Sequence, residues 1–211
     1  MEEQIMNMPA VALRGLTILP GMIAHFDVSR ERSLRAVEEA MEQDQKIYLV
    51  TQRNVDSEDP TQEDLYQMGI VADIKQVVRL QNDVVRILVD GISRAALLGF
   101  TGNEKYLEAE ICYCDSNADS LPEDLREAML LGVREAFHRY AAVVGKISKE
   151  LIRQIDQYED LEKLIDYVTN NLPVSYELKQ QVLEAEDIND RYQVIVSLLL
   201  SQVEVISIKN E

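Results

Sequence analysis

The sequence predicts an α+β protein in which a β-rich domain precedes a helical bundle. Up to about residue 114, apolar and polar residues alternate with a period of two, as in strands with one buried face. After that point apolar residues recur every three or four positions, as in amphipathic helices. The polar segment CDSNADS separates the two patterns. We therefore expect a β-rich domain at residues 1–115 and a helical bundle at residues 116–211.

The first strands are expected in the apolar stretch PAVALRGLTILPGMIAHFDV, residues 9–28. An export signal would begin with positive charge, whereas this chain opens MEEQ, and Arg14 interrupts the apolar run. A membrane-spanning helix is excluded by Pro20-Gly21, a pair that favours a tight turn. The stretch predicts a strand at Ala10 to Gly15, a turn, and a strand at Met22 to Val28.

Further short strands and one helix complete the predicted β-rich domain. RERSLRAVEEAMEQ has helical spacing, with Ser29 as the expected N-cap. Gln81-Asn82-Asp83 separates two β-branched runs and predicts a hairpin. About seven strands in sequence indicate a small barrel or folded sheet. The remaining predicted strands are residues 46–51, 69–80, 84–90 and 92–100, and the segment YLEAEICYC.

The second half predicts a series of helices. SLPEDLREAMLLGVREAFHRYAAVV opens with Ser120 and Glu123 in the spacing of a capping box. Further helices are expected at 148–157, from Leu161 to Leu172 before Pro173, and at 175–184. The tail has strand-forming residues, yet its apolar positions keep helical spacing from Ile188 to Ile206, so we expect one long helix. It has no glycine C-cap, which suggests a helix that continues further.

Charge argues against several classes of partner. The formal net charge is -17, with 20 acids against 11 bases in residues 1–115 and 18 against 10 in residues 116–211. Proteins that grip nucleic acid gain most of their affinity from Lys and Arg on phosphates, so we expect no nucleic acid partner and no anionic membrane. Cys112 and Cys114 are the only cysteines, and we expect structural thiols in a reducing cytoplasm, with no metal site.

Several segments together resemble a known family. PAVALRGLTILPGM, followed by VSRERSLRAVEEAM, resembles the opening of the amino-terminal domain of the Lon family of ATP-dependent proteases. GIVADIKQVVRLQNDVVRILVDGISRA is similar to the family's strand, hairpin and strand, with its Gly-x-x-Arg-Ala pattern at Gly91, Arg94 and Ala95. NLPVSYELKQQVLEAEDINDR is similar to the segment before the family's long connecting helix. The resemblance covers essentially the whole chain.

This resemblance implies a PUA-like β domain followed by a helical bundle whose last helix runs toward an ATPase ring. It also implies a parent protein that is a cytoplasmic, homo-hexameric AAA+ serine endopeptidase of protein quality control, with ATP and Mg²⁺ bound outside this chain. No phosphate-binding loop of the form G-x-x-x-x-G-K-[ST] occurs here, since Gly145-Lys146 lacks its other residues. Ser148 and Lys149 are adjacent in sequence, so their side chains would diverge around a helix.

The remaining polar residues do not predict catalysis. His25 lies in an alternating strand and His138 on a helix, and we expect packed or surface imidazoles. The acidic clusters 56–59 and 119–124 lack the ordered ligand positions and the glycine of a calcium loop, so they are expected to be solvated loops. We predict no catalytic, cofactor-binding or metal-binding residue in this chain.

Two kinds of residue are candidates for contacts with client proteins or neighbouring subunits. RERSLR is the densest positive cluster, although its arginines could instead pair with Glu31 and Glu39 on a solvated helix face. Apolar residues next to predicted turns could form an adaptable surface, although core packing is their commoner role. The candidates are Met22, Ile23, Arg32, Arg35, Tyr66 and Met68.

The sequence therefore predicts a non-catalytic module that recognises unfolded or tagged proteins and helps to assemble a Lon-type protease. The alternative is a stand-alone Lon-domain module that binds a protein or a small ligand without protease activity. RNA binding, by analogy with PUA-like folds, conflicts with the charge balance and would depend on Arg32 and Arg35.

Overall fold

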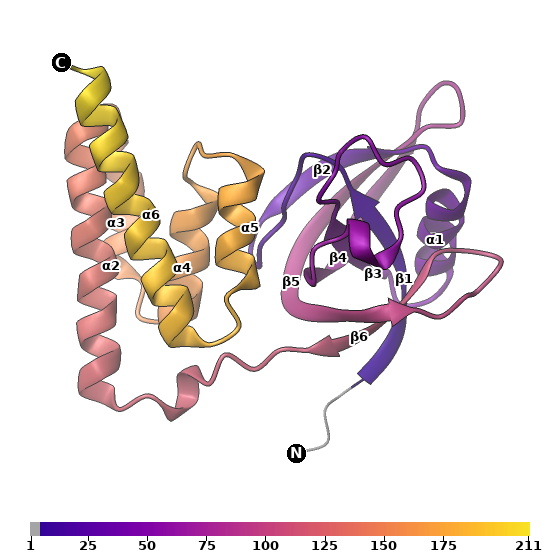
Figure 1. Ribbon diagram of the computed structural model, residues 1–211, viewed down its shortest axis with the longest axis horizontal. Coiled ribbons are helices and arrows are strands. Elements are labelled where there is room, and N and C mark those ends of the chain that lie inside the picture. Colours follow the sequence, from indigo (N-terminus) through magenta and orange to yellow (C-terminus); the bar gives the residue numbers. More distant parts are fainter. Residues whose placement is uncertain (1–4) are drawn as a thin grey trace. The chain divides into compact units, whose positions relative to one another are not determined.

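The computed structural model describes residues 5–211 and divides the chain into two compact units (Figure 1). The first unit ends at Cys114 and the second begins at Asp115. The first contains all of the described strands and one α-helix, whereas the second consists of helices. The predicted α+β class is therefore confirmed.

The first unit is a mixed, folded sheet of six strands in the order β2-β5-β4-β3-β1-β6. β5 also pairs with β6, so the sheet returns on itself. β1 and β3 are parallel, and every other pairing is antiparallel. The elements are β1 (Ile5–Leu13), β2 (Ile23–Val28), α1 (Glu31–Glu42), β3 (Lys46–Thr51), η1 (Gln62–Asp64), β4 (Met68–Arg79), β5 (Val85–Phe100) and β6 (Glu108–Tyr113).

The two strands predicted at residues 84–90 and 92–100 are one bent strand, β5, which the curved ribbon in Figure 1 shows. Gly91 does not end it. The register with β4 shifts between Val71 and Ala72, beside Gly91, so the strand bends there without losing its partner. The helix prediction also needs a correction, because Arg30 is the N-cap of α1 in place of Ser29, and no side chain caps this end.

Two hydrophobic clusters stabilise the first unit. One lies between α1 and the sheet and contains buried residues such as Val37, Ile47 and Ile87. The other contains Tyr48, whose hydroxyl donates a 2.9 Å hydrogen bond to the carbonyl oxygen of Ala95. This bond satisfies the only polar atom of the Tyr48 side chain, which is fully buried.

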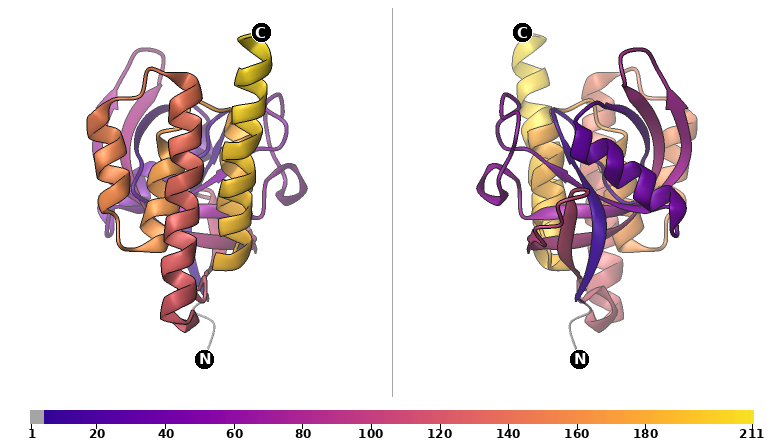
Figure 2. Two further views of the ribbon diagram at one scale, coloured as in Figure 1. Left: turned by 90° about the vertical axis from the view of Figure 1, so that its left-hand side faces the viewer. Right: turned by 90° about the vertical axis from the view of Figure 1, so that its right-hand side faces the viewer.

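The second unit contains five α-helices and a short 3-10 turn, η2 (Ala118–Ser120). α2 and α6 lie side by side, as Figure 2 shows. Ser148, Asp160, Ser175 and Asp187 each cap a helix with a side-chain oxygen. The α-helices are α2 (Glu123–Val144), α3 (Lys149–Gln157), α4 (Leu161–Asn170), α5 (Tyr176–Glu184) and α6 (Ile188–Lys209).

The predicted capping box at the start of α2 is wrong. Pro122 occupies the N-cap position, and the Ser120 hydroxyl donates to the carbonyl oxygen of Asn117 instead. The prediction of one long final helix is confirmed by α6. The spacing of its apolar residues therefore outweighed their strand propensity.

α6 changes character along its length. Ile188, Ile195 and Leu199 are fully buried, whereas Val205 is 40% exposed and Ile208 is 72% exposed. Among residues 5–211, α6 is the one helix whose length and composition would suffice to cross a membrane. This is weak evidence for a membrane span, because helices that pack in a soluble core pass the same test.

Candidate functional site

A tight turn at residues 19–22 leads from the segment after β1 into β2, and hydrogen bonds fix it to the middle of β5. Gly21 has a φ of +79°, and the Met22 N–H donates to the Leu19 carbonyl at 3.1 Å, as expected for a turn with glycine at its third position. The Gly21 N–H donates to the Gly91 carbonyl at 2.8 Å, and the Gly91 N–H donates to the Met22 carbonyl at 2.9 Å. These bonds hold the turn in one place.

The turn presents apolar side chains to solvent. Ile23 is 68% exposed and Ile92 is 41% exposed, whereas Met22 is partly buried against the first cluster. Ile23 is paired with Asp90, two residues before Ile92. We call Met22, Ile23 and Ile92 the turn surface. The sequence did not indicate that Ile92 is exposed. An apolar residue in a strand pattern looks the same whether it is buried in the core or exposed at a bulge.

Arg32 and Arg35 contact the loop that joins β5 to β6. Arg32 Nη2 donates to the carbonyl oxygens of Asn103 and Tyr106 at 2.7 and 3.3 Å. Arg35 contacts the Lys105 carbonyl at 3.4 Å and pairs with Glu31 at 2.5 Å. The Glu31 pair was expected from the helical spacing. The expected pair with Glu39 is replaced by a hydrogen bond from Gln43 to Glu39.

Met68 is the first residue of β4 and Tyr66 lies just before this strand, and the two side chains differ in exposure. The Arg53 guanidinium lies 4.6 Å from the centre of the Tyr66 ring, and its Nε donates to the Leu65 carbonyl at 3.1 Å. Met68 is only 1% exposed, and its sulfur lies 3.5 Å from Cys114 Sγ. Met68 is therefore a core side chain in this structure. The six predicted contact residues lie in three separate places and do not form one site.

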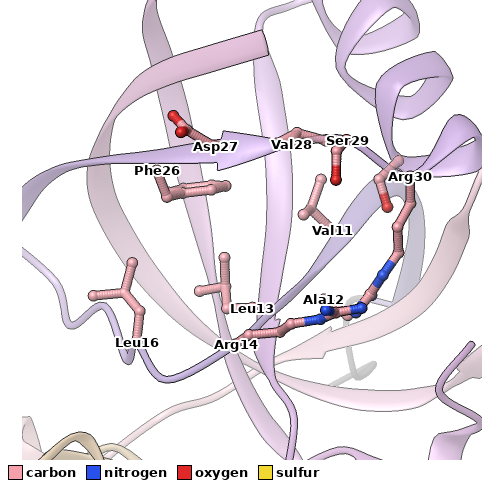
Figure 3. A pocket seen from close by; sticks show the side chains of 11 residues that line it. Val11, Ala12, Leu13, Arg14, Leu16, Phe26, Asp27, Val28, Ser29 and Arg30 are labelled. Atoms are coloured by element: carbon pink, nitrogen blue, oxygen red, sulfur yellow. The ribbon is translucent and has the colours of Figure 1, made fainter. Parts of the chain in front are cut away.

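A cavity of about 320 Å³ opens beside the start of α1 (Figure 3). Arg30 is partly buried there and donates to Gln52 Oε1 at 2.6 Å and to the Ser57 carbonyl at 3.3 Å. Burial and the nearby charge of Arg14 lower the pKa of Arg30. The lining residues are Val11, Ala12, Leu13, Arg14, Leu16, Phe26, Asp27, Val28, Ser29, Arg30 and Ser33.

Sequence reasoning missed this cavity. Arg14 and Arg30 follow β1 and β2, which are not neighbouring strands, and the folding of the sheet brings the two arginines to one cavity. No short motif marks such an arrangement, because each arginine is also typical of an ordinary solvated surface.

Apart from this cavity, a groove of about 500 Å³ lies between α1 and the hairpin formed by β4 and β5. Its apolar wall includes Met41 and Leu80, which are 37% and 38% exposed. Glu38, Glu42 and Asp83 also line it, so the groove combines an apolar surface with negative charge.

The histidines do not lie in a cavity with a nucleophile. His25 is exposed on β2, and His138 Nε2 lies 2.7 Å from Asp156 Oδ1 on an exposed part of the second unit. Within residues 5–211, no group of three or more His, Cys, Asp or Glu side chains is placed to hold a metal ion.

The fold defines a class of α+β protein in which a folded β unit is followed by a helical unit. The chain belongs to the family of the ATP-dependent protease La (LON) substrate-binding domain, whose family model matches residues 7–201. The family resemblance seen in the sequence is thus confirmed.

Individual relatives agree with this assignment. The chain is 36% identical over 211 residues to the Lon protease of Lachnoclostridium phytofermentans, covering 100% of this chain and 26% of that protein. It is 30% identical over 210 residues to Lon protease 1 of Bacillus subtilis, covering 100% of this chain and 27% of that protein. The chain therefore spans about a quarter of the length of the curated relatives that it matches.

Solved structures confirm the fold. The N-terminal domain of Mycobacterium avium complex Lon protease superimposes with a TM-score of 0.74 at 18% identity, covering 92% of this chain and 98% of that one. The Lon N-terminal domain protein from Xanthomonas campestris gives a TM-score of 0.61 at 13% identity, covering 91% and 98%.

Proposed function

We propose that this chain recognises unfolded or tagged proteins for a Lon-type ATP-dependent serine protease and has no catalytic activity of its own. The observation that carries this proposal is the turn surface, where Ile23 is 68% exposed on a turn fixed by backbone hydrogen bonds. The family's description as a substrate-binding domain supports the same role. ATP, Mg²⁺ and the peptidase residues would belong to other parts of a longer parent protein.

The turn surface suits this task because it is apolar and preorganised. Unfolded proteins expose apolar segments that native proteins bury, and contact with Ile23 would remove both surfaces from water. Burial of such a side chain contributes roughly 1.5 to 3 kcal/mol, which corresponds to weak binding by one copy. Several copies in a homo-hexamer would raise the effective affinity without any new contact.

The end of α6 supports a role in assembly. Val205 and Ile208 are exposed on the part of the helix that follows its buried residues. Their burial against another subunit would supply an apolar contact between copies. We propose that the protein is a cytoplasmic homo-oligomer. Because the chain carries a formal charge of -17, we also propose that it has no nucleic acid or membrane partners.

A binding assay with a labelled unfolded protein tests the recognition role. Ile23→Glu should weaken binding of fluorescent, reduced and carboxymethylated lactalbumin by about tenfold, as loss of roughly 1.4 kcal/mol requires. Val78→Glu is the matched control, since Val78 is 41% exposed on β4 and lies outside the turn surface. Equal binding by the wild-type chain and Ile23→Glu would refute the turn surface as the receptor.

A further inference from the structure

The cavity beside α1 has a cationic end and an apolar end. Figure 3 shows the guanidinium groups of Arg14 and Arg30 approaching each other at one end, with Phe26 and Leu16 on the other side. Arg30 is anchored by Gln52 and the Ser57 carbonyl. Arg14 is exposed and has no hydrogen bond or ion pair with any of residues 5–211. Two like charges this close favour an anion between them.

The start of α1 borders the cationic end, where Arg30 and Ser33 line the cavity. Arg30 is the N-cap of this twelve-residue helix, and no side chain accepts a hydrogen bond from its first turn. The first amide groups of a helix lack intrahelical acceptors and carry partial positive charge, so they attract anions. Glu31 does not neutralise them fully, because its carboxylate is paired with Arg35.

Ser33 is a separate indication of a ligand. Its side chain lines the cavity, and the residue is only 4% exposed. Across the described part of the chain, no group forms a hydrogen bond with its hydroxyl. Its oxygen is not cut off from solvent, so it is reached through the cavity, where an anion could accept a hydrogen bond from it.

The acidic residues near the cavity do not fill this role. Asp27 accepts hydrogen bonds from Arg86 Nε and Nη2 at 2.8 and 3.2 Å, and in Figure 3 its carboxylate points away from the two arginines. Glu58 and Asp59 stabilise the charge of Arg30 from a distance but do not line this cavity. The cationic end therefore stays open to a carboxylate from outside.

We propose that this cavity binds a carboxylate attached to an apolar group. The two arginines and Ser33 would hold the carboxylate, since guanidinium groups match its planar geometry. Leu16 and Phe26 would contact the apolar part. A volume of about 320 Å³ accommodates one amino-acid residue or a small acid, and is at the lower end of small-molecule sites. The ligand is either the C-terminal residue of a polypeptide or a free monocarboxylic acid.

Calorimetry with four probes tests the proposal on the complete chain. The probes are a hexapeptide ending in leucine, the same peptide with a C-terminal amide, 4-methylpentanoate and inorganic phosphate. We expect the free-acid peptide or 4-methylpentanoate to bind, and the amide to bind at least about tenfold more weakly, because it lacks the charge-assisted hydrogen bonds. If 4-methylpentanoate binds as tightly as the peptide, the ligand of the cavity is a free acid. If only the peptide binds, the ligand is the C-terminal residue of a polypeptide.

Variants link this binding to the cavity. Arg14→Gln and Ser33→Ala should each weaken binding of the favoured acid, Arg14→Gln by about tenfold. Arg139→Gln is the matched control, since it removes one positive charge from an exposed helical position in the second unit and should change nothing. Three results would each overturn the proposal: tighter binding of phosphate than of either acid, binding of the amide peptide as tight as that of the favoured acid, or an unchanged affinity of Arg14→Gln. Thermal unfolding checks that each variant is folded.

Discussion

The backbone N–H of Gly91 donates to the carbonyl oxygen of Met22 at 2.9 Å, and this bond ties the apolar turn to the centre of β5. Such a close approach requires glycine. A Cβ atom at position 91 would lie 2.4 Å from the Leu19 carbonyl oxygen and 2.9 Å from Ile70 Cδ1. The exposure of Ile23 therefore depends on a residue in another strand.

Gly91→Ala should displace the turn and destabilise the first unit by about 1 to 3 kcal/mol, as overpacking does. It should also weaken binding of an unfolded protein. Urea unfolding and the lactalbumin assay measure the two effects. Gly99→Ala is the control, because a Cβ there meets only Gln62 Oε1 at 3.5 Å. A Gly91→Ala chain as stable as Gly99→Ala would contradict this account of the turn.

Arg32→Ala should increase the mobility of the loop between β5 and β6. The side chain of Arg32 bonds the Asn103 and Tyr106 carbonyls from an exposed position, so we expect a loss of stability below about 1 kcal/mol. Faster amide hydrogen exchange in residues 101–107 is the expected result. Arg79→Ala, which removes an exposed arginine from β4, should leave exchange in this loop unchanged.

The Asp27–Arg86 pair predicts a pH-dependent contribution to stability. The hydrogen bond from Arg86 lowers the pKa of Asp27, so folding is favoured while this carboxylate is ionised. The contribution is present above the unfolded pKa of about 3.9 and is lost as the pH falls through the folded pKa. Urea unfolding should therefore separate wild type from Arg86→Gln at pH 7 more than at pH 3. A separation that grows on acidification would refute this linkage.

We expect substitution of Arg191 to have the largest effect on the stability of the second unit. Its side chain is 2% exposed and donates to the carbonyls of Ala185 and Glu186, each at 3.0 Å, and to Glu162 at 3.2 Å. Arg191→Met would remove these hydrogen bonds, made from a buried side chain, and should cost about 3 kcal/mol or more in urea unfolding. Glu162→Gln should cost much less, because Glu162 is partly exposed. Similar losses for both variants would show that the ion pair, not the carbonyl bonds, is the main contribution.

Turns and helices could be predicted from the sequence where neighbouring residues determine the local structure. Pro20-Gly21 predicted the turn, and apolar spacing predicted α6 despite its strand-forming residues. Predictions of helix starts failed at Ser29 and Ser120 because each depends on where the preceding chain enters the helix. Propensity does not contain that information.

The candidate sites were less predictable because they depend on long-range pairing. Met68 was a candidate contact residue, with core packing as the commoner alternative, and the structure buries it at the start of β4. Arg14 and Arg30 line one cavity although fifteen residues separate them in the chain. Tertiary contacts of this kind leave no periodic signal in a single sequence.

The position of the turn on β5 has a mechanical consequence. β5 is hydrogen-bonded to β2, β4 and β6, so its backbone is held along both edges. A pulling force on a chain attached at Ile23 would load many of these bonds at once. Under the proposed function, a bound protein under tension would therefore pull on a site that keeps its shape.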